Sequence, residues 1–511
     1  MSVGYGQNGL RTEGERGEPP WHGRLVRVVE ALMVGDEQHD STFRGPYLLR
    51  DWAALAAGEA AAKVAGFVAF AYLARVLEPG AYGAVELAAA LVLFSRLFVH
   101  FGFGTIGARE VARNESTARM LAAQIPAGRL ILLCLVAVIL CLLIPCLRQS
   151  ARTNRLLGLF ALSLIFSPWH QAWLLQGLRM MKWIPIVRVI RMSVFAGGVV
   201  LWVRGAGEEW KVGVVEIGAA CAGTAVFLLV QQFRLTPVRL SFKRKPLVRL
   251  FRSAAPVGFS RVAWSLNWFL PMALVASLSL PEQTGRFGAA FRIVLSLNTF
   301  VILYHFNLFP WIARSADLPK TRFADFAGCW FRVAAWVGIS GGLAGSLLAE
   351  PVCVVVFGPA FRGAACSLCI LIWLIPIALL SGHSRHALIA YGRQRYALFA
   401  QAAGVMVTLG LGAVLIPRAG PEGAAVSMLA SGVTVWAVAH RYARNFVGRL
   451  PCVGPVIIPV GLALLGAGMA HWLGESIPWG ARVVLAVAIP TLGSPCIDLR
   501  LLRDARRILG C

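Results

Sequence analysis

Residues 131–144 read ILLCLVAVILCLLI, an apolar run without a single charged side chain. Together with the apolar residues on either side, this run predicts a helix over 122–145. A helix that crosses the hydrocarbon core of a bilayer needs about 20 predominantly apolar residues, and this segment is long enough. Comparable segments follow one another from about residue 53 to about residue 499, so a membrane is predicted to decide the fold.

The composition of the whole chain agrees with this interpretation. Hydrophobic residues make up 58% of the 511 residues, charged residues make up 14%, and the mean hydropathy is +0.69. Segments of this kind predict an all-α polytopic membrane protein with about 14 transmembrane helices. We expect these helices over residues 53–74, 83–106, 122–145, 156–177, 183–203, 212–233, 253–276, 286–309, 324–349, 366–390, 397–416, 422–440, 453–473 and 479–498.

The basic residues of the connecting loops predict the orientation. The even-numbered loops hold 20 Lys and Arg residues and the odd-numbered loops hold 10. Cytoplasmic loops are enriched in Lys and Arg, so this bias places both termini in the cytoplasm. A missed helix would reverse the alternation downstream, so the bias also favours an even number of helices.

The net charge of +25 does not indicate a nucleic-acid partner, because the basic residues are spread over short loops. The densest basic segment is RLTPVRLSFKRKPLVRLFR, over residues 234–252, and it contains no acidic residue. It is interpreted as a cytoplasmic topology determinant, with a site for lipid headgroups or a partner protein as the alternative. Residues 1–50 are polar, lack the hydrophobic core of a signal peptide, and are expected to form a cytoplasmic tail.

The chain contains an internal duplication. Residues 74–92 read ARVLEPGAYGAVELAAALV and residues 277–295 read SLSLPEQTGRFGAAFRIVL. Both place an acidic residue and a proline near a glycine–aromatic pair and then enter an apolar helix. The duplication predicts two pseudo-symmetric six-helix bundles, over 51–233 and 253–446, joined by the linker 234–252. Two extra helices and a basic tail follow over 447–511. Such repeats are common in transporters, with the substrate site between the halves.

Several short motifs carry a resemblance to a known family. They are LARVLEPGAYG, FGFGTIGAREVAR, WLLQGLRMMKW, GRFGAAFRI, FGPAFRGAACSLCIL, ALIAYGRQRY and VLIPRAGPEGAAVSML, in this order over roughly residues 50–450. With them the chain resembles the polysaccharide (O-antigen-type) transporters of the multidrug/oligosaccharidyl-lipid/polysaccharide exporter superfamily.

The resemblance implies a flippase and not an enzyme. Such proteins move undecaprenyl-diphosphate-linked oligosaccharides across the bacterial cytoplasmic membrane for O-antigen (lipopolysaccharide), capsule or exopolysaccharide synthesis. The lipid tail stays in the bilayer while the sugars and the diphosphate pass through a central cavity. The expected partners are the lipid-linked oligosaccharide, the bilayer, and polysaccharide polymerase and chain-length regulator proteins. No cofactor or metal is expected.

A diphosphate requires cations within the membrane, where each ionisable residue is a candidate functional residue. Arg96 and Arg292 fall where the resemblance places the cavity arginines of lipid II flippases, in SRLF and AAFRI. Lys63 lies in the first helix, one turn after Glu59, and these two residues are also predicted as a self-neutralising pair. Arg188 and Arg191 of the fifth helix are interpreted as cavity-facing or as reaching for the interface.

The seventh helix combines a cation with aromatic side chains. Trp264 and Trp268 follow Arg261 at three and seven residues, so all three share one helical face. The tryptophans are candidates for stacking on sugar rings and the arginine is a candidate for holding phosphate. The alternative is an aromatic belt at the membrane interface with an arginine that extends to the headgroups.

The acidic residues deepest in the expected helices are Glu59, Glu86 and Glu216. Each is a candidate for proton exchange or sodium binding, with Glu59 and Glu216 preferred, and each is equally a candidate ion-pair partner for an arginine. His383, Arg385 and His386 cluster in the tenth helix, but no third metal ligand follows at a useful spacing.

Four alternatives to the polysaccharide flippase remain. A lipid II flippase and a multidrug or cation antiporter belong to the same superfamily. A membrane enzyme would need catalytic carboxylates in a large aqueous loop, whereas the loops are short and contain no D-x-D pair. A membrane scaffold without transport activity predicts that neutralising Arg96 and Arg292 changes nothing.

Overall fold

The computed structural model describes residues 45–147, 149–178, 180–234, 240–315, 320–447, 454–472, 478–498 and 501. Most of the expected N-terminal tail (1–44), part of the basic linker (235–239) and the last residues (502–511) lie outside these ranges. The chain divides into a unit Met1–Trp52 and a unit Ala53–Cys511, and the second unit contains all the sites discussed below.

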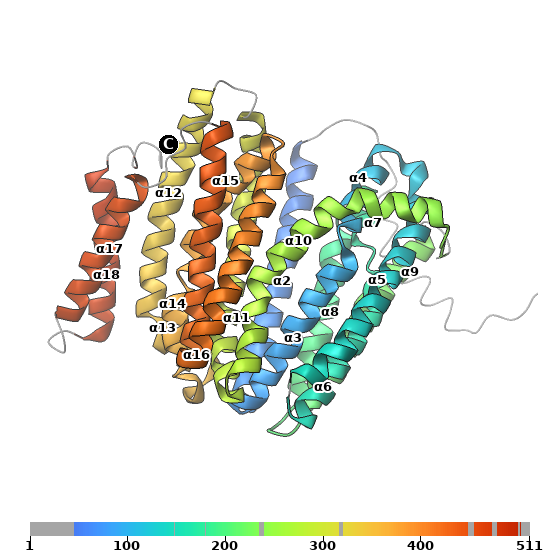
Figure 1. The fold of residues 1–511 in the computed structure, drawn as a ribbon, viewed down its shortest axis with the longest axis horizontal. Helices are drawn as coiled ribbons and strands as arrows, with labels where there is room; N and C mark the ends of the chain where they lie inside the picture. The colour runs from blue at the N-terminus through green and yellow to red at the C-terminus, as the bar shows by residue number, and fades with distance from the viewer. Residues whose placement is uncertain are drawn as a thin grey trace, which may run out of the picture. The chain divides into compact units, whose positions relative to one another are not determined.

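The described residues form helices and no strand (Figure 1). The first half contains α2 (Gly45–Val76), α3 (Pro79–His100), α4 (Phe103–Arg113), α5 (Ala118–Cys146), α6 (Ala151–Leu162), α7 (Ala172–Gly177), α8 (Trp183–Trp202) and α9 (Glu209–Arg234). The second half contains α10 (Arg244–Leu278), α11 (Pro281–Ser315), α12 (Lys320–Leu347), α13 (Ala349–Phe357), α14 (Ala364–Leu371), α15 (Leu374–Ala390), α16 (Gln394–Val447), α17 (Gly454–Trp472) and α18 (Trp479–Ile497). Three short 3₁₀ helices complete the set: η1 (Glu115–Thr117), η2 (Ser163–Trp169) and η3 (Pro359–Phe361).

Each of the fourteen expected segments overlaps helical structure, although 83–106 is divided between α3 and α4 and 366–390 between α14 and α15. Among the described residues, ten helices are long and apolar enough to span a membrane, and the pair α12–α13, bent by 65°, makes up to eleven. The long α16 covers two expected helices, because Gly420 (φ 53°, ψ −128°) breaks the helical geometry between them. The remaining two are α10, in which polar side chains interrupt the apolar run, and the segment α6–η2–α7.

The segment α6–η2–α7 is a broken helix, which the hydropathy pattern does not reveal. A break within a bilayer leaves carbonyl groups without helical partners, and lipid cannot satisfy them. Arg129 of α5 supplies the missing donors, because its Nη1 donates to the carbonyl oxygens of Pro168 (3.3 Å) and His170 (2.8 Å). The side chain of Arg129 is fully buried, with 1% of the residue exposed.

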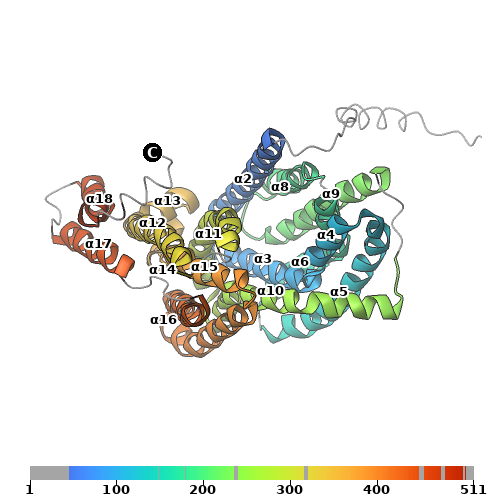
Figure 2. The ribbon, with the colours of Figure 1, turned by 90° about the horizontal axis from the view of Figure 1, so that it is seen from above.

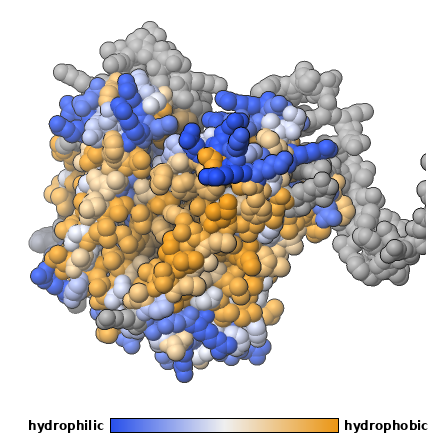
Figure 3. All heavy atoms as spheres, turned by 45° about the vertical axis from the view of Figure 1, so that its right-hand side comes forward, coloured by the Kyte–Doolittle hydropathy of each residue, from blue (hydrophilic) through white to orange (hydrophobic). Residues whose placement is uncertain are grey.

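An apolar surface surrounds the helices. In Figure 3 a broad hydrophobic band separates hydrophilic ends at the top and bottom of the face shown. On α5, the segment with the longest apolar run, Leu135, Val138 and Leu142 are exposed. A band of this kind fits contact with lipid tails, which are as apolar as these side chains.

The two duplicated segments meet in the interior. α3 begins at Pro79 and α11 begins at Pro281, and the two helices lie side by side (Figures 1 and 2). A Cβ atom on Gly83 would lie 2.6 Å from the backbone nitrogen of Gly285, and a Cβ atom on Gly285 would overlap the carbonyl oxygen of Pro79. Glycine at both positions therefore permits a backbone-to-backbone approach that any side chain would prevent.

The last two helices stand at the edge of the bundle. α17 and α18 pack against each other and against α12, as seen from above in Figure 2. Few of their residues are buried inside the protein. They therefore add lipid-facing surface and contribute no side chain to the sites below.

Candidate functional site

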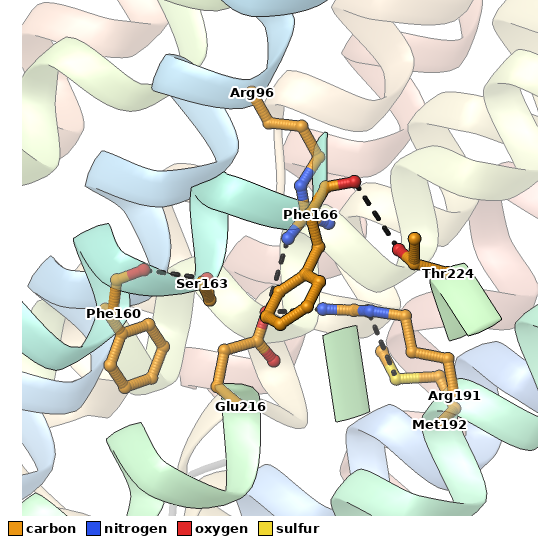
Figure 4. Close-up of polar contacts among 8 residues, drawn as sticks. All are labelled: Arg96, Phe160, Ser163, Phe166, Arg191, Met192, Glu216 and Thr224. Atoms are coloured by element: carbon orange, nitrogen blue, oxygen red, sulfur yellow. Dashed lines mark hydrogen bonds and ion pairs between the residues drawn. The ribbon is translucent and has the colours of Figure 1, made fainter. Parts of the chain in front are cut away.

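Three charged side chains from three helices meet in the first half of the chain (Figure 4). Glu216 of α9 accepts on its Oε1 from Arg96 of α3, at 3.3 Å from Nη2, and also from Nη2 of Arg191 of α8, at closer range. We call Arg96, Arg191 and Glu216 the Glu216 cluster. Two guanidinium groups share one carboxylate, so the cluster carries one net positive charge.

The Glu216 cluster is only partly buried. The side chains of Arg96 and Arg191 are 24% and 22% exposed, whereas that of Glu216 is 8% exposed. The carboxylate therefore lies behind its two partners, and the guanidinium groups present the accessible surface. Arg96 is the more weakly held of the two, because its contact with Glu216 is the longer one.

The backbone around the cluster brings α8 and α9 close together. Gly223 lies about two helical turns beyond Glu216, and a Cβ atom there would lie 3.1 Å from the Cβ of Arg191. On the other side of Arg191, its Nη1 lies 3.9 Å from the Sδ of Met192. Nearby, the Thr224 hydroxyl donates to the Phe166 carbonyl of η2 at 3.4 Å (Figure 4), so the broken helix is tied to the same region.

A second pair of charges joins the two duplicated segments. Arg292 of α11 binds Glu86 of α3 in a bidentate manner, with Nε at 2.9 Å from Oε1 and Nη2 at 2.5 Å from Oε2. We call these two residues the Arg292–Glu86 pair. The side chains are 14% and 4% exposed, so the pair is more deeply buried than the Glu216 cluster and is electrically neutral.

Several groups hold the Arg292–Glu86 pair in place. The Tyr82 hydroxyl donates to Oε1 of Glu86 at 2.5 Å, and the Phe70 ring lies 3.5 Å from the Cζ of Arg292. Gly288 leaves room for the carboxylate, because a Cβ atom there would lie 2.7 Å from the Cγ of Glu86. Both carboxylate oxygens of Glu86 thus have a donor, and the pair is held by packing around it, as a buried ion pair requires.

Glu59 and Lys63 do not form the local pair that their spacing predicts. Glu59 is bound instead by Nη1 of Arg188 of α8. Lys63 is exposed on α2, has no ion-pair partner among the described residues, and is repelled by the nearby charge of Arg292. The sequence spacing favoured a contact within α2, but Arg188, which comes from α8, reaches the carboxylate of Glu59 instead.

The predicted face of α10 divides between two regions. Nη2 of Arg261 donates to the Thr105 hydroxyl of α4 at 3.1 Å, and the arginine is exposed. Trp264 and Trp268, whose ring centroids lie 6.0 Å apart, line a cavity of about 330 Å³ in the second half of the chain. This cavity, which we call the C-terminal cavity, is lined by residues of α10, α11, α15 and α16. The arginine and the two tryptophans therefore do not converge on one ligand in this structure.

Two residues of these sites can be recognised in the sequence, although their partners cannot. Arg191 and Glu86 are intramembrane ionisable residues, and the sequence marks both without indicating their partners. The pairing of Glu86 with Arg292, and of Glu216 with Arg96, realises the ion-pair alternative for these acidic residues.

The sequence matches one family model. Residues 48–316 match the model described as "Polysaccharide biosynthesis protein". No curated protein shows a significant sequence match to the chain.

The fold is similar to those of several solved transporters. The lipid II flippase MurJ in an inward closed conformation is 12% identical with a TM-score of 0.69, over 88% of this chain and 99% of that chain. An inward-facing multidrug resistance MATE transporter of the MOP superfamily is 12% identical with a TM-score of 0.63, over 76% and 94%. A MOP superfamily transporter from Pyrococcus furiosus is 14% identical with a TM-score of 0.50, over 80% and 99%. At these identities the likeness shows a shared transporter fold.

Proposed function

We propose a flippase, from the premise that the chain belongs to the polysaccharide biosynthesis protein family. Its substrate in this proposal is an oligosaccharide repeat unit linked to undecaprenyl diphosphate, destined for O-antigen, capsule or exopolysaccharide. Its structural neighbours are transporters, and we propose transport without catalysis.

The Glu216 cluster is the observation that carries the proposal. A diphosphate brings about two negative charges into a layer of low dielectric constant, where unpaired charge is costly. Arginine is suited to bind it, because the planar guanidinium offers paired donors to phosphate oxygens. Two accessible guanidinium groups with one carboxylate between them supply the net positive charge that such a group needs.

The geometry of the cluster suggests the order of events. Arg96 makes the longer contact with Glu216, so it can turn toward a phosphate while Arg191 keeps the carboxylate neutral. Arg292, Lys63 and Arg261 are the further cations that we propose for the substrate path. Trp264 and Trp268 are the side chains that we propose for contact with sugar rings.

Ion coupling follows from the same contacts. A proton or sodium ion that binds Glu216 would release Arg96 for the substrate, and one that binds Glu59 would release Arg188. We therefore retain Glu59 and Glu216 as the proposed coupling residues. In each case the arginine and the coupling ion would compete for the same carboxylate.

The cellular setting is part of the proposal. We place the protein in the bacterial cytoplasmic membrane with both termini in the cytoplasm, following the loop charges. The division into two six-helix halves, a basic linker and two extra helices keeps the boundaries expected from the duplication. Polymerase and chain-length regulator proteins are the proposed protein partners.

The test compares charge removal inside and outside the cluster. Arg96→Gln, Arg191→Gln and the double variant are expressed in a strain that depends on this protein, with Arg109→Gln as the control. Arg109 is an exposed residue of α4 paired with its neighbour Glu110. We expect the double variant to lose surface glycan at least tenfold and to accumulate lipid-linked repeat units, at unchanged protein levels on a blot.

Other outcomes separate the alternatives. Normal surface glycan in the double variant contradicts the role of the cluster. Accumulation of lipid II on depletion of the protein would indicate a lipid II flippase, and drug sensitivity alone would indicate an exporter of small molecules. Unchanged glycan after complete deletion would contradict the flippase in that strain.

A further inference from the structure

The C-terminal cavity has a lining that the flipping of a diphosphate does not require. The groups that face it include Trp264, Trp268, Asn298, His305, Arg385 and Gln401. None of its lining residues is acidic. Its volume of about 330 Å³ lies at the lower end of the roughly 300–1,000 Å³ range of small-molecule sites.

Arg385 supplies the positive charge at this cavity. In the part of the chain that the structure describes, no carboxylate lies within ion-pair distance of it, and its buried Nε has no hydrogen-bond partner. Every other arginine discussed so far is bound to a carboxylate, a carbonyl or a hydroxyl group. Arg385 is partly exposed, and a cation with a buried, unpartnered donor is stabilised by a ligand that supplies an acceptor.

His305 is a second residue at this cavity whose polar atoms lack hydrogen-bond partners among the described residues. His305 is 3% exposed, and its ring stacks on that of His386 at 4.8 Å between centroids. Neither ring nitrogen of His305 makes a hydrogen bond, although the carbonyl of Ala378 lies nearby. Arg385 and His386 line the same cavity as His305. The described residues contain no group of three His, Cys, Asp or Glu side chains that could hold a metal ion.

Two amides complete the polar surface. Asn267 donates to the Oε1 of Gln401 at 2.8 Å and accepts from the Ser431 hydroxyl at 3.0 Å, which fixes the side chain of Gln401. The Gln401 NH₂ group is then left without a protein acceptor among the described residues. Asn298 is 4% exposed, and its amide has no hydrogen-bond partner in the same part of the chain. The cavity is thus rich in unused donors.

We propose that the C-terminal cavity binds a sugar that carries an oxyanion, such as a hexuronate carboxylate or a sugar phosphate. The charge and the free donors of Arg385, Asn298 and Gln401 select the oxyanion, and the absence of acidic groups removes repulsion. Trp264 and Trp268 provide the aromatic surface for the sugar ring. The inference rests on the proposed function, in which such a sugar belongs to the transported oligosaccharide.

The test is binding to the purified full-length protein in lipid nanodiscs. The shift of the thermal unfolding midpoint is followed against concentration of glucuronate, glucose 1-phosphate, glucose and inorganic phosphate, which yields an apparent Kd for each. We expect glucuronate and glucose 1-phosphate to bind at least about tenfold more tightly than glucose or inorganic phosphate. Equal binding of glucose, or equal binding of inorganic phosphate, overturns the proposal.

Variants assign the binding to the cavity. Arg385→Gln should raise the apparent Kd for glucuronate at least about tenfold, as expected for a charge-assisted hydrogen bond. Arg395→Gln is the matched control, because Arg395 is exposed and contacts only Tyr396 in the described structure. Unchanged affinity in Arg385→Gln contradicts the site.

A second variant keeps the test decisive if Arg385→Gln does not fold. Asn298→Leu removes an amide that has no partner, so it should fold as the wild type does. We expect it to weaken glucuronate binding several-fold, and wild-type affinity would contradict the proposal. If sugar anions fail to bind while the Arg96 and Arg191 variants still lose surface glycan, this inference fails and the flippase stands.

Discussion

The Glu216 cluster and the Arg292–Glu86 pair use the same chemistry for different ends. In the pair, one guanidinium meets one carboxylate through two hydrogen bonds, with an aromatic ring and a tyrosine hydroxyl around them. In the cluster, one carboxylate is divided between two guanidinium groups that remain about a quarter exposed. The pair is electrically neutral and more deeply buried, whereas the cluster carries one net positive charge and is more exposed.

The difference lies in where each group sits. The pair joins α3 and α11, the two duplicated helices, beyond the backbone contact of Gly83 with Gly285. The cluster gathers α3, α8 and α9 within one half. α3 takes part in both, so Arg96 and Glu86 lie on the same helix and face different partners. We infer that the pair contributes more to stability than the cluster does, and that the cluster is the more accessible of the two to a ligand.

The largest expected effect tests the contribution of the Arg292–Glu86 pair to stability. Arg292→Met leaves Glu86 buried without a cation, and should lower the free energy of unfolding by about 3–5 kcal/mol. Glu86→Gln should cost a similar amount for the converse reason. The free energy is measured by reversible unfolding of the purified protein.

The double variant Glu86→Gln/Arg292→Met is the control for that prediction. Because it removes both charges together, it should recover most of the stability lost in either single variant. A double variant as unstable as the sum of the two would show that packing, and not the ion pair, determines the cost.

The next largest effect tests the helix contact that supports the pair. Gly285→Ala places a Cβ atom onto the carbonyl oxygen of Pro79, so α3 and α11 must separate. We expect a loss of about 1–3 kcal/mol, as for overpacked interiors. Gly218→Ala on α9 is the matched control, because a Cβ atom there meets nothing within 4 Å, and it should gain about 0.5–1 kcal/mol.

The cluster should respond more weakly in stability. In Arg96→Gln, Glu216 keeps Arg191 as its partner, so we expect a loss of at most about 1 kcal/mol, appropriate to a partly exposed ion pair. The same variant should nevertheless reduce flipping, as measured by surface glycan. A loss of stability equal to that of Arg292→Met would erase the distinction between the two sites.

The smallest effect is expected at the Arg188–Glu59 contact. The Arg188 side chain is largely accessible there, so Arg188→Gln should change the free energy of unfolding by about 0–1 kcal/mol. Unfolding at two salt concentrations provides the check, because a screened surface pair loses its contribution as the ionic strength rises. A cost of several kcal/mol would place this contact with the buried pair.

Hydropathy predicted the helical segments well because lipid exposure leaves a strong compositional mark on residues such as 131–144. The break in α6–η2–α7 was not predicted, because the donor that satisfies its free carbonyl groups, Arg129, lies on another helix. The kink at Gly420 lay within an expected turn, between two prolines that the sequence displays.

Side-chain partners were harder to predict than helices. Arg96 and Glu216 are 120 residues apart, and Arg292 and Glu86 are 206 apart, so no local spacing relates them. Glu59 shows the opposite error, because a plausible local partner, Lys63, is not the one it binds. The C-terminal cavity has the same origin: His305 becomes notable only once α11 and α15 bring it to Arg385 and His386.

The buried contact of Arg129 bears on how the chain enters the membrane. The segment 151–177 reaches the bilayer with exposed carbonyl groups, and it cannot satisfy them from within itself. Its donor lies on α5, the helix that is synthesised immediately before it. These carbonyl groups therefore gain their donor only when the broken segment packs against α5. Arg129, a buried residue of an apolar helix, thus couples the burial of the segment 151–177 to its packing against α5.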